Sequence, residues 1–150
     1  KYVPTGFGTN VIIPGNKIYY VDGGGLYEFG ILTSAIHNCW MRAVCGRLKS
    51  DFNYSNTIVY NNFIWPNLTD SHRAEIEMCA QAVLDARSSH QGSTLADMYD
   101  PDNEFLFPDL MKAHAELDAA VESAYGVDFN GDENKIVAHL FNLYAEKVGE

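Results

Sequence analysis

A run of polar and basic side chains between residues 38 and 55 has the chemistry that DNA recognition requires. Asn38, Arg42 and Lys49 fall on one face of a predicted helix. An Arg side chain can bond O6 and N7 of guanine together, an Asn amide can pair with N6 and N7 of adenine, and Lys and Ser suit phosphates. The candidate DNA-contacting residues are Asn38, Arg42, Arg47, Lys49, Ser50, Asn53, Tyr54 and Ser55. The alternative, which composition alone favours, is a solvated helix face followed by a polar loop.

Other short patterns are better explained as structural. Tyr60–Pro66 is superficially similar to the Asn-Pro-Pro-aromatic loop that holds a flipped base in amino-methyltransferases, but it lacks the proline pair. We therefore expect Asn61 and Asn62 to form a turn and Phe63 and Trp65 to pack. Asp128–Asp132 resembles the start of a calcium loop, yet Glu133 and His139 stand where Gly and Glu are needed, so we expect a capped helix start.

Thiol catalysis and metal binding have no adequate pattern. His37 lies two residues from Cys39, and this spacing places the two side chains on different faces of a helix. We expect His37 to be a hydrogen-bonded core residue. The other histidines have no metal-ligand spacing, and no glycine loop that could cradle a phosphate follows a predicted strand.

The elements that must position the candidate residues follow from hydrophobic periodicity. Residues 1–30 suggest strands and turns, with strand candidates at Val11–Ile13 and Lys17–Val21. A helix is predicted from Thr33 or Ser34 to about Leu48, burying Ile36, Trp40, Val44 and Leu48. A strand is predicted at Thr57–Tyr60 because its residues are β-branched and aromatic.

The sequence pattern of the remainder of the chain predicts helices. One begins at Thr69 or Asp70 and runs to about Ser88, a short helical turn lies within 93–99, a second long helix spans 109–125 and stops at Gly126, and a third begins at Asp132. The predicted fold class is therefore α+β: a small strand-and-helix unit over residues 1–66, followed by a mainly α-helical unit over residues 67–150.

Charge divides in the same place. The 150-residue chain has a net charge of −10; residues 1–66 carry five bases and three acids, and residues 67–150 carry five bases and 17 acids. The acidic unit should be repelled by phosphates. Three cysteines without a CxxC pattern suggest a reducing compartment. No apolar run reaches the length of a membrane helix. The sequence starts with KYVPTGFG and not with Met, so we expect it to be an internal part of a longer protein.

Two ordered motifs are similar to one family. HxxWMRxVxGRLxSDxxYSxxIVYNNFxWP and SxLADxYDP…LxKAHxxLDxAVxxAYG resemble the end of the target-recognition domain and the C-terminal helical domain of the MmeI-type (type IIL) restriction–modification DNA methyltransferases. The similarity runs from about Gly6 to Lys147; Ile64 stands where the family usually has Pro, and a single Pro108 follows Phe107.

The resemblance implies a large cytoplasmic enzyme that moves a methyl group from S-adenosylmethionine to adenine N6 in double-stranded DNA, often with a nuclease attached. It places the S-adenosylmethionine site and the catalytic loop in an upstream methyltransferase domain, so it assigns no catalytic, cofactor or metal residue to this chain. It also places Ser34–Ser55 in the last DNA-recognition segment. The alternatives are a helical protein-interaction module, which an exposed apolar patch on residues 70–147 would favour, and, more remotely, a small-molecule enzyme, which would need a deep polar pocket.

Overall fold

The computed structural model describes residues 2–3, 5–8, 18–48 and 51–149. Helices dominate, and a two-stranded hairpin contributes the strands of this described part, which confirms the α+β class. The strand candidate Val11–Ile13 lies outside these ranges. Of the candidate Lys17–Val21, the described residues Ile18–Val21 do not form a strand, so that prediction was wrong for them.

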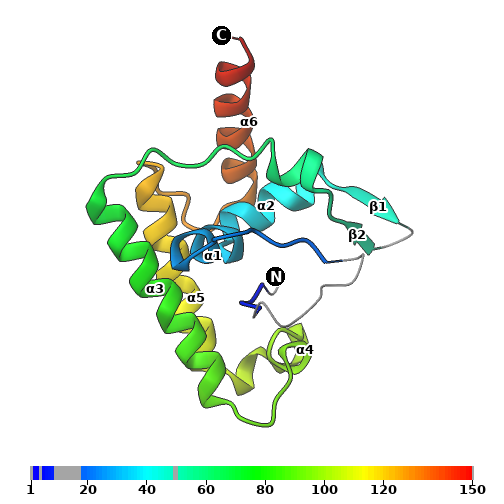
Figure 1. Ribbon diagram of the computed structural model, residues 1–150, viewed down its shortest axis with the longest axis vertical. Helices are drawn as coiled ribbons and strands as arrows, with labels where there is room; N and C mark the ends of the chain where they lie inside the picture. The colour runs from blue at the N-terminus through cyan, green and yellow to red at the C-terminus, as the bar shows by residue number, and fades with distance from the viewer. Residues whose placement is uncertain (1, 4, 9–17, 49–50, 150) are drawn as a thin grey trace.

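Five helices build the body of the molecule. Helices α3 (Asp70–Ser89) and α5 (Pro108–Ala124) lie side by side, and α1 (Leu26–Thr33) and α2 (Ala35–Val44) cross them (Figure 1). Helix α6 (Glu133–Gly149) packs its first turns on α2 and then extends away from the body (Figure 1). One hydrophobic core joins all five helices, and its fully buried members include Ile31, Ile36, Ile76, Leu110, Leu117, Ile136 and Leu140. Because that core spans both halves of the chain, neither half is packed independently of the other.

Helix α1 was not predicted from the sequence, because its residues are almost uniformly apolar and give no helical stripe. It is separated from α2 by Ser34, whose ψ of 158° breaks the helix. The Ser34 hydroxyl donates to the carbonyl of Ile31 at 2.7 Å and accepts from the backbone N–H of His37 at 3.4 Å. Ser34 thus caps α2, as predicted.

Helix α2 ends earlier than predicted. Its last residue is Val44, and the chain then forms β1 (Gly46–Leu48), which pairs antiparallel with β2 (Asp51–Asn53). The prediction of one helix to Leu48 was wrong, because Gly46 is a poor helix former and the backbone groups after it are satisfied by the hairpin.

The predicted strand at Thr57–Tyr60 is also wrong, since Asn56–Tyr60 form a π-helical turn, η1. Its backbone is held from both sides. The Trp40 indole N–H donates to the carbonyl of Val59 at 2.9 Å, and the Asn62 amide donates to the carbonyls of Thr57 and Ile58 at 3.0 Å each. Tertiary contacts therefore override the β propensity of this segment.

The predictions for the later helices are confirmed. Thr69 caps α3, and Thr94 caps the short helix α4 (Leu95–Met98), which is followed by a 3₁₀ turn, η2 (Pro101–Leu106). Gly126 ends α5 with a φ of +70°, a conformation that favours glycine. The Asp132 carboxylate accepts from the backbone N–H of Asn134 at 3.0 Å, which confirms the capped helix start.

Candidate nucleic-acid interface

The hairpin of β1 and β2 forms in the part of the chain in which the sequence places the basic segment. Gly46 pairs with Asn53, Arg47 with Phe52, and Leu48 with Asp51. The hairpin stands away from the helical body (Figure 1), and Asn53 and Phe52 are exposed, Phe52 by 41%. Lys49 and Ser50 follow β1 in the sequence and lie outside the described residues. Arg47 and Asn53 thus belong to a hairpin and not to the helix face that periodicity suggested.

Asn38 is a correction to the predicted exposed face. Its side chain is 1% exposed, and its amide donates to the carbonyls of Thr33 and Ser34 at 3.2 and 2.8 Å. Its Oδ1 accepts from the backbone N–H of Val3 at 2.8 Å. The helix-wheel argument failed because the N-terminal segment covers this side of α2, so the Asn38 amide lies inside the protein.

Arg42 is partly covered as well. Its guanidinium forms an ion pair with Glu133 at 2.8 Å and donates to the Cys39 sulfur at 3.3 Å, and its side chain is 24% exposed. Asn38 and Arg42 are therefore not aligned with Lys49 along one free helix face, as the sequence suggested.

Tyr54 and Ser55 lie where β2 leads into η1. The Ser55 hydroxyl is 2.9 Å from that of Thr57, and the Tyr54 hydroxyl is 3.3 Å from Nε2 of His37. Burial raises the pKa of Tyr54 to about 12 and lowers the pKa of His37 to about 4. The predicted role of His37 as a hydrogen-bonded core residue is confirmed, because it is 4% exposed and its Nδ1 lies 3.1 Å from the carbonyl of Leu32.

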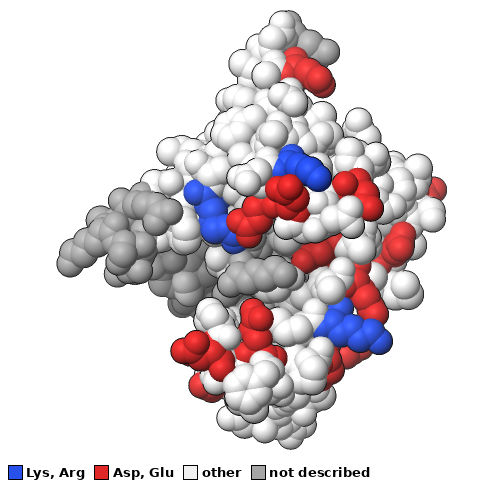
Figure 2. Space-filling model, turned by 180° about the vertical axis from the view of Figure 1, so that it is seen from behind, with Lys and Arg blue, Asp and Glu red and all other residues white. Residues whose placement is uncertain are grey.

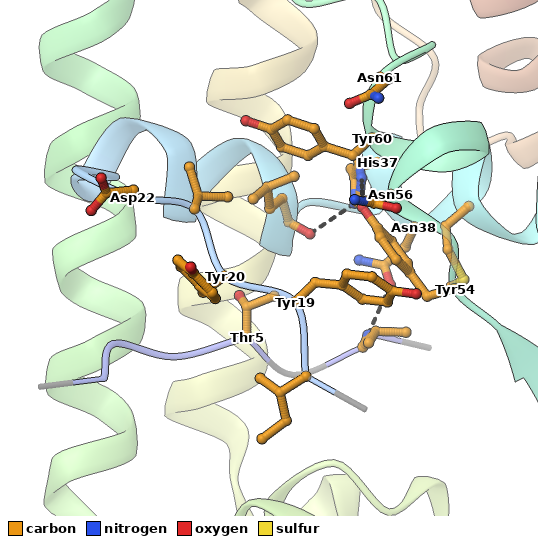
Figure 3. Close-up of a pocket in the computed structure, with 15 residues that line it drawn as sticks. Thr5, Tyr19, Tyr20, Asp22, His37, Asn38, Tyr54, Asn56, Tyr60 and Asn61 are labelled. Atoms are coloured by element: carbon orange, nitrogen blue, oxygen red, sulfur yellow. Dashed lines mark hydrogen bonds between the residues drawn. The ribbon is translucent and has the colours of Figure 1, made fainter. Parts of the chain in front are cut away.

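A cavity of about 600 Å³ opens at the foot of the hairpin, between α2, η1 and the segment before α1 (Figure 3). Tyr19 and Tyr54 both line it and pack against each other, with ring centroids 5.8 Å apart. Its polar lining residues include Asp22, Asn56, Tyr60 and Asn61. This cavity was not predicted from the sequence, because the adjacent Tyr19 and Tyr20 suggested a strand.

The Asn-aromatic segment is structural, as predicted. Asn62 closes the turn after η1, Phe63 is 2% exposed, and Trp65 packs edge-on against Phe63 with ring centroids 5.7 Å apart. The hydroxyl of Tyr125 on α5 donates to the carbonyl of Ile64 at 2.7 Å, which ties the segment to the helical unit.

Among the charged side chains that Figure 2 shows, acidic ones prevail. On the face shown in Figure 2, Asp and Glu side chains are spread widely and outnumber Lys and Arg. Several bases of the helical unit lie beside acids, such as Arg73 beside Glu77 and Lys112 beside Glu116. Across the described ranges, no cluster of His, Cys, Asp and Glu suits a metal ion, and no helix is long and apolar enough to cross a membrane.

The described residues combine a helical body with a two-stranded hairpin that projects from it (Figure 1). Residues 1–67 match the profile of the MmeI target recognition domain, and residues 68–150 match that of the MmeI C-terminal domain. The chain therefore belongs to the MmeI family.

Two relatives extend this comparison. The chain is 39% identical to "DNA methyltransferase A" of Bacillus subtilis (strain 168) over 97% of its own length and 16% of that protein. It also matches the structure of the type IIL restriction-modification enzyme MmeI in complex with DNA, with 40% identity and a TM-score of 0.81 over 85% of this chain and 17% of that one. The chain thus spans about a sixth of the length of these relatives.

Proposed function

We propose that this chain belongs to a cytoplasmic DNA (adenine-N6) methyltransferase of a restriction–modification system and contributes to recognition of its double-stranded DNA target. The observation that carries the proposal is the match, at 40% identity and a TM-score of 0.81, to MmeI solved in complex with DNA. Residues 1–66 would complete the recognition domain. Residues 67–150 would form an acidic helical unit that packs against this domain and stabilises it.

Methyl transfer from S-adenosylmethionine is assigned to another part of the same protein. The Asn61–Phe63 segment, which is superficially similar to a methyltransferase loop, closes a turn and packs in the core. We therefore assign no residue of this chain to the cofactor, and an upstream methyltransferase domain is the partner that the proposal requires.

The DNA contacts are proposed to come from the hairpin. A two-stranded antiparallel ribbon fits the major groove of B-DNA, and this one includes Arg47 and Asn53. Lys49 and Ser50 stand between its two strands in the sequence and complete the proposed contact set. Tyr54 and Ser55 lie at its foot and would support it. Asn38 is left out of the contact set because its amide is buried and hydrogen-bonded.

The test is substitution of hairpin residues in the full-length enzyme. Arg47→Ala or Asn53→Ala should change the methylation preference at one target position, at a cost of about 1–3 kcal/mol if the side chain contacts a base. Lys49→Ala should weaken binding evenly across sequences and lower the salt dependence. Lys112→Ala is the matched control, since Lys112 is an exposed base on α5, beside Glu116. Unchanged methylation across a panel of sites for all three hairpin variants would refute the assignment.

A second function, docking on a protein partner, is favoured by exposed apolar side chains on the helical unit. Leu95, Phe105 and Leu106, on α4 and η2, are 43%, 77% and 54% exposed. A Phe105→Ser, Leu106→Ser variant tests this role: reduced methylation with unchanged DNA affinity would support docking on the methyltransferase domain, and unchanged methylation would oppose it.

A further inference from the structure

The placement of the hairpin depends on helix α2, because α2 passes into β1 through Cys45 alone. Any rotation of α2 must therefore move the hairpin. Side chains from the acidic helical unit hold α2 near its beginning, its middle and its end, and these three attachments carry a further inference about target recognition.

The first attachment is at the beginning of α2. Asp118 of α5 accepts a hydrogen bond from the backbone N–H of Ala35, the first residue of α2, at 2.7 Å through Oδ1. Its Oδ2 accepts from the Tyr2 hydroxyl at 2.7 Å. A carboxylate at a helix N-terminus satisfies an otherwise unpaired N–H and is favoured by the helix dipole. One side chain therefore joins α5, the start of α2 and the N-terminal segment.

The second attachment is in the middle of α2. Trp40 is 2% exposed, and its ring packs against Phe141 and Tyr144 of α6, with centroid distances of 5.4 and 6.1 Å. Because the Trp40 indole also bonds the carbonyl of Val59, this contact links α6 to the turn that follows the hairpin.

The third attachment is in the last turn of α2, four positions before the hairpin begins. Arg42 pairs with Glu133, the first residue of α6, at 2.8 Å. The Glu133 side chain is 60% exposed, so the pair is a surface contact that can be altered without opening the core.

We propose that Asp118 and Glu133 are positioning residues for target recognition: they hold α2 in one orientation and thereby set where the hairpin lies on DNA. The inference rests on the proposed DNA-recognition function and adds a role for the acidic unit and for Arg42. A ten-residue helix is about 15 Å long, so a tilt of roughly 10° about its first residue displaces its end by about 2.6 Å. Hydrogen bonds to base edges tolerate only a few tenths of an ångström, so such a tilt would change which bases are contacted.

The test uses Asp118→Asn and Glu133→Gln in the full-length methyltransferase. The readout is kcat/KM for the cognate duplex and for duplexes altered at one base pair, together with the melting temperature of each variant. We expect the ratio of cognate to altered-site methylation to fall between about 2-fold and 30-fold, the range usual for coupling through residues that do not touch the ligand. Asp109→Asn is the matched control, because Asp109 is also a carboxylate on α5 but pairs with His90, and its ratio should not change.

A charge swap separates positioning from general stabilisation. Arg42→Glu and Glu133→Arg should each lower the discrimination ratio, and the double variant should recover it. A double variant as poor as the worse single variant overturns the role of the ion pair. An equal loss of methylation at every site, following the melting temperature, overturns the positioning role as a whole. The proposed function fails separately if the three hairpin variants Arg47→Ala, Lys49→Ala and Asn53→Ala all leave methylation unchanged.

Discussion

Asn38 of α2 accepts a hydrogen bond from the backbone N–H of Val3 at 2.8 Å. The same side chain donates to the carbonyls of Thr33 and Ser34, where α1 ends and α2 begins. One buried amide thus bonds three backbone groups from two parts of the chain, of which the Ser34 carbonyl also accepts from the backbone N–H of Asn38 at 3.1 Å. Asn38 holds the N-terminal segment against the helix that carries the hairpin.

Asn38→Ala should destabilise the protein. Buried backbone groups left without partners cost about 1–3 kcal/mol each, although relaxation and water reduce the total, so we expect a loss of about 2–3 kcal/mol. The free energy of unfolding from urea denaturation measures this, with the exposed α6 residue Asn142→Ala as a control expected to differ little from wild type. If the free energy of unfolding of Asn38→Ala equalled that of Asn142→Ala, the hydrogen bonds of the Asn38 side chain would not contribute to stability.

His37 should make stability depend on pH. Its Nδ1–H must donate to the carbonyl of Leu32, because a carbonyl only accepts, so Nε2 of the neutral ring accepts from the Tyr54 hydroxyl. Burial, the main cause, lowers the pKa of His37 from 6.5 to about 4, although the bond to Leu32 partly opposes this. The neutral form is therefore favoured in the folded state, and its contribution, about 3 kcal/mol, is complete above pH 6.5 and is lost as the pH falls toward 4.

The measurement is the free energy of unfolding of wild type and His37→Gln across that range. Carboxylates also titrate near its lower end, so the difference between the two proteins isolates the imidazole. His37→Gln should be less stable at neutral pH, and its stability should fall less on acidification. Parallel curves for the two proteins would show that His37 is not held neutral.

The sequence predicted the helical unit well because its helices carry local start and stop signals. Thr69 and Asp132 each cap a helix where the pattern indicated, and Gly126 ends one. These signals act within a few residues, so no knowledge of the rest of the fold is needed to interpret them.

The recognition segment was predicted less well because long-range contacts decide its structure. Asn38 is polar and was expected on a free face, but the N-terminal segment covers it. Val59 has strand propensity, yet Trp40 and Asn62 hold its segment as a π-helical turn. The DNA-contacting role of the hairpin residues stays a prediction, supported by their place on a projecting ribbon.

Gly30→Ala should weaken the contact between α1 and α3. A Cβ at this position would lie 2.8 Å from Cγ2 of Ile76 and 3.3 Å from Cβ of Ala80. Alanine alone would favour a helix by up to about 1 kcal/mol, but overpacking of a core typically costs about 1–3 kcal/mol, so we expect a net loss. Ile76→Ala removes the clashing methyl group, and the double variant should lose less stability than the two single changes added together. Gly8→Ala, where nothing lies within 4 Å of the new Cβ, is the control in the same urea experiment.

The 150-residue chain alone should bind DNA weakly and with little sequence preference. Its net charge is −10, and Arg42, Arg73, Lys112 and Lys135 lie beside acidic partners. If Arg47 and Lys49 of the hairpin are the main phosphate contacts, two neutralised phosphates predict a slope of about −2 for the logarithm of affinity against the logarithm of salt concentration. Fluorescence anisotropy with a labelled duplex at several salt concentrations measures this slope, and Lys49→Ala should reduce it by about 1. Tight, sequence-specific binding at physiological salt would contradict the prediction and would mean that this part of the protein recognises its target without the rest of the enzyme.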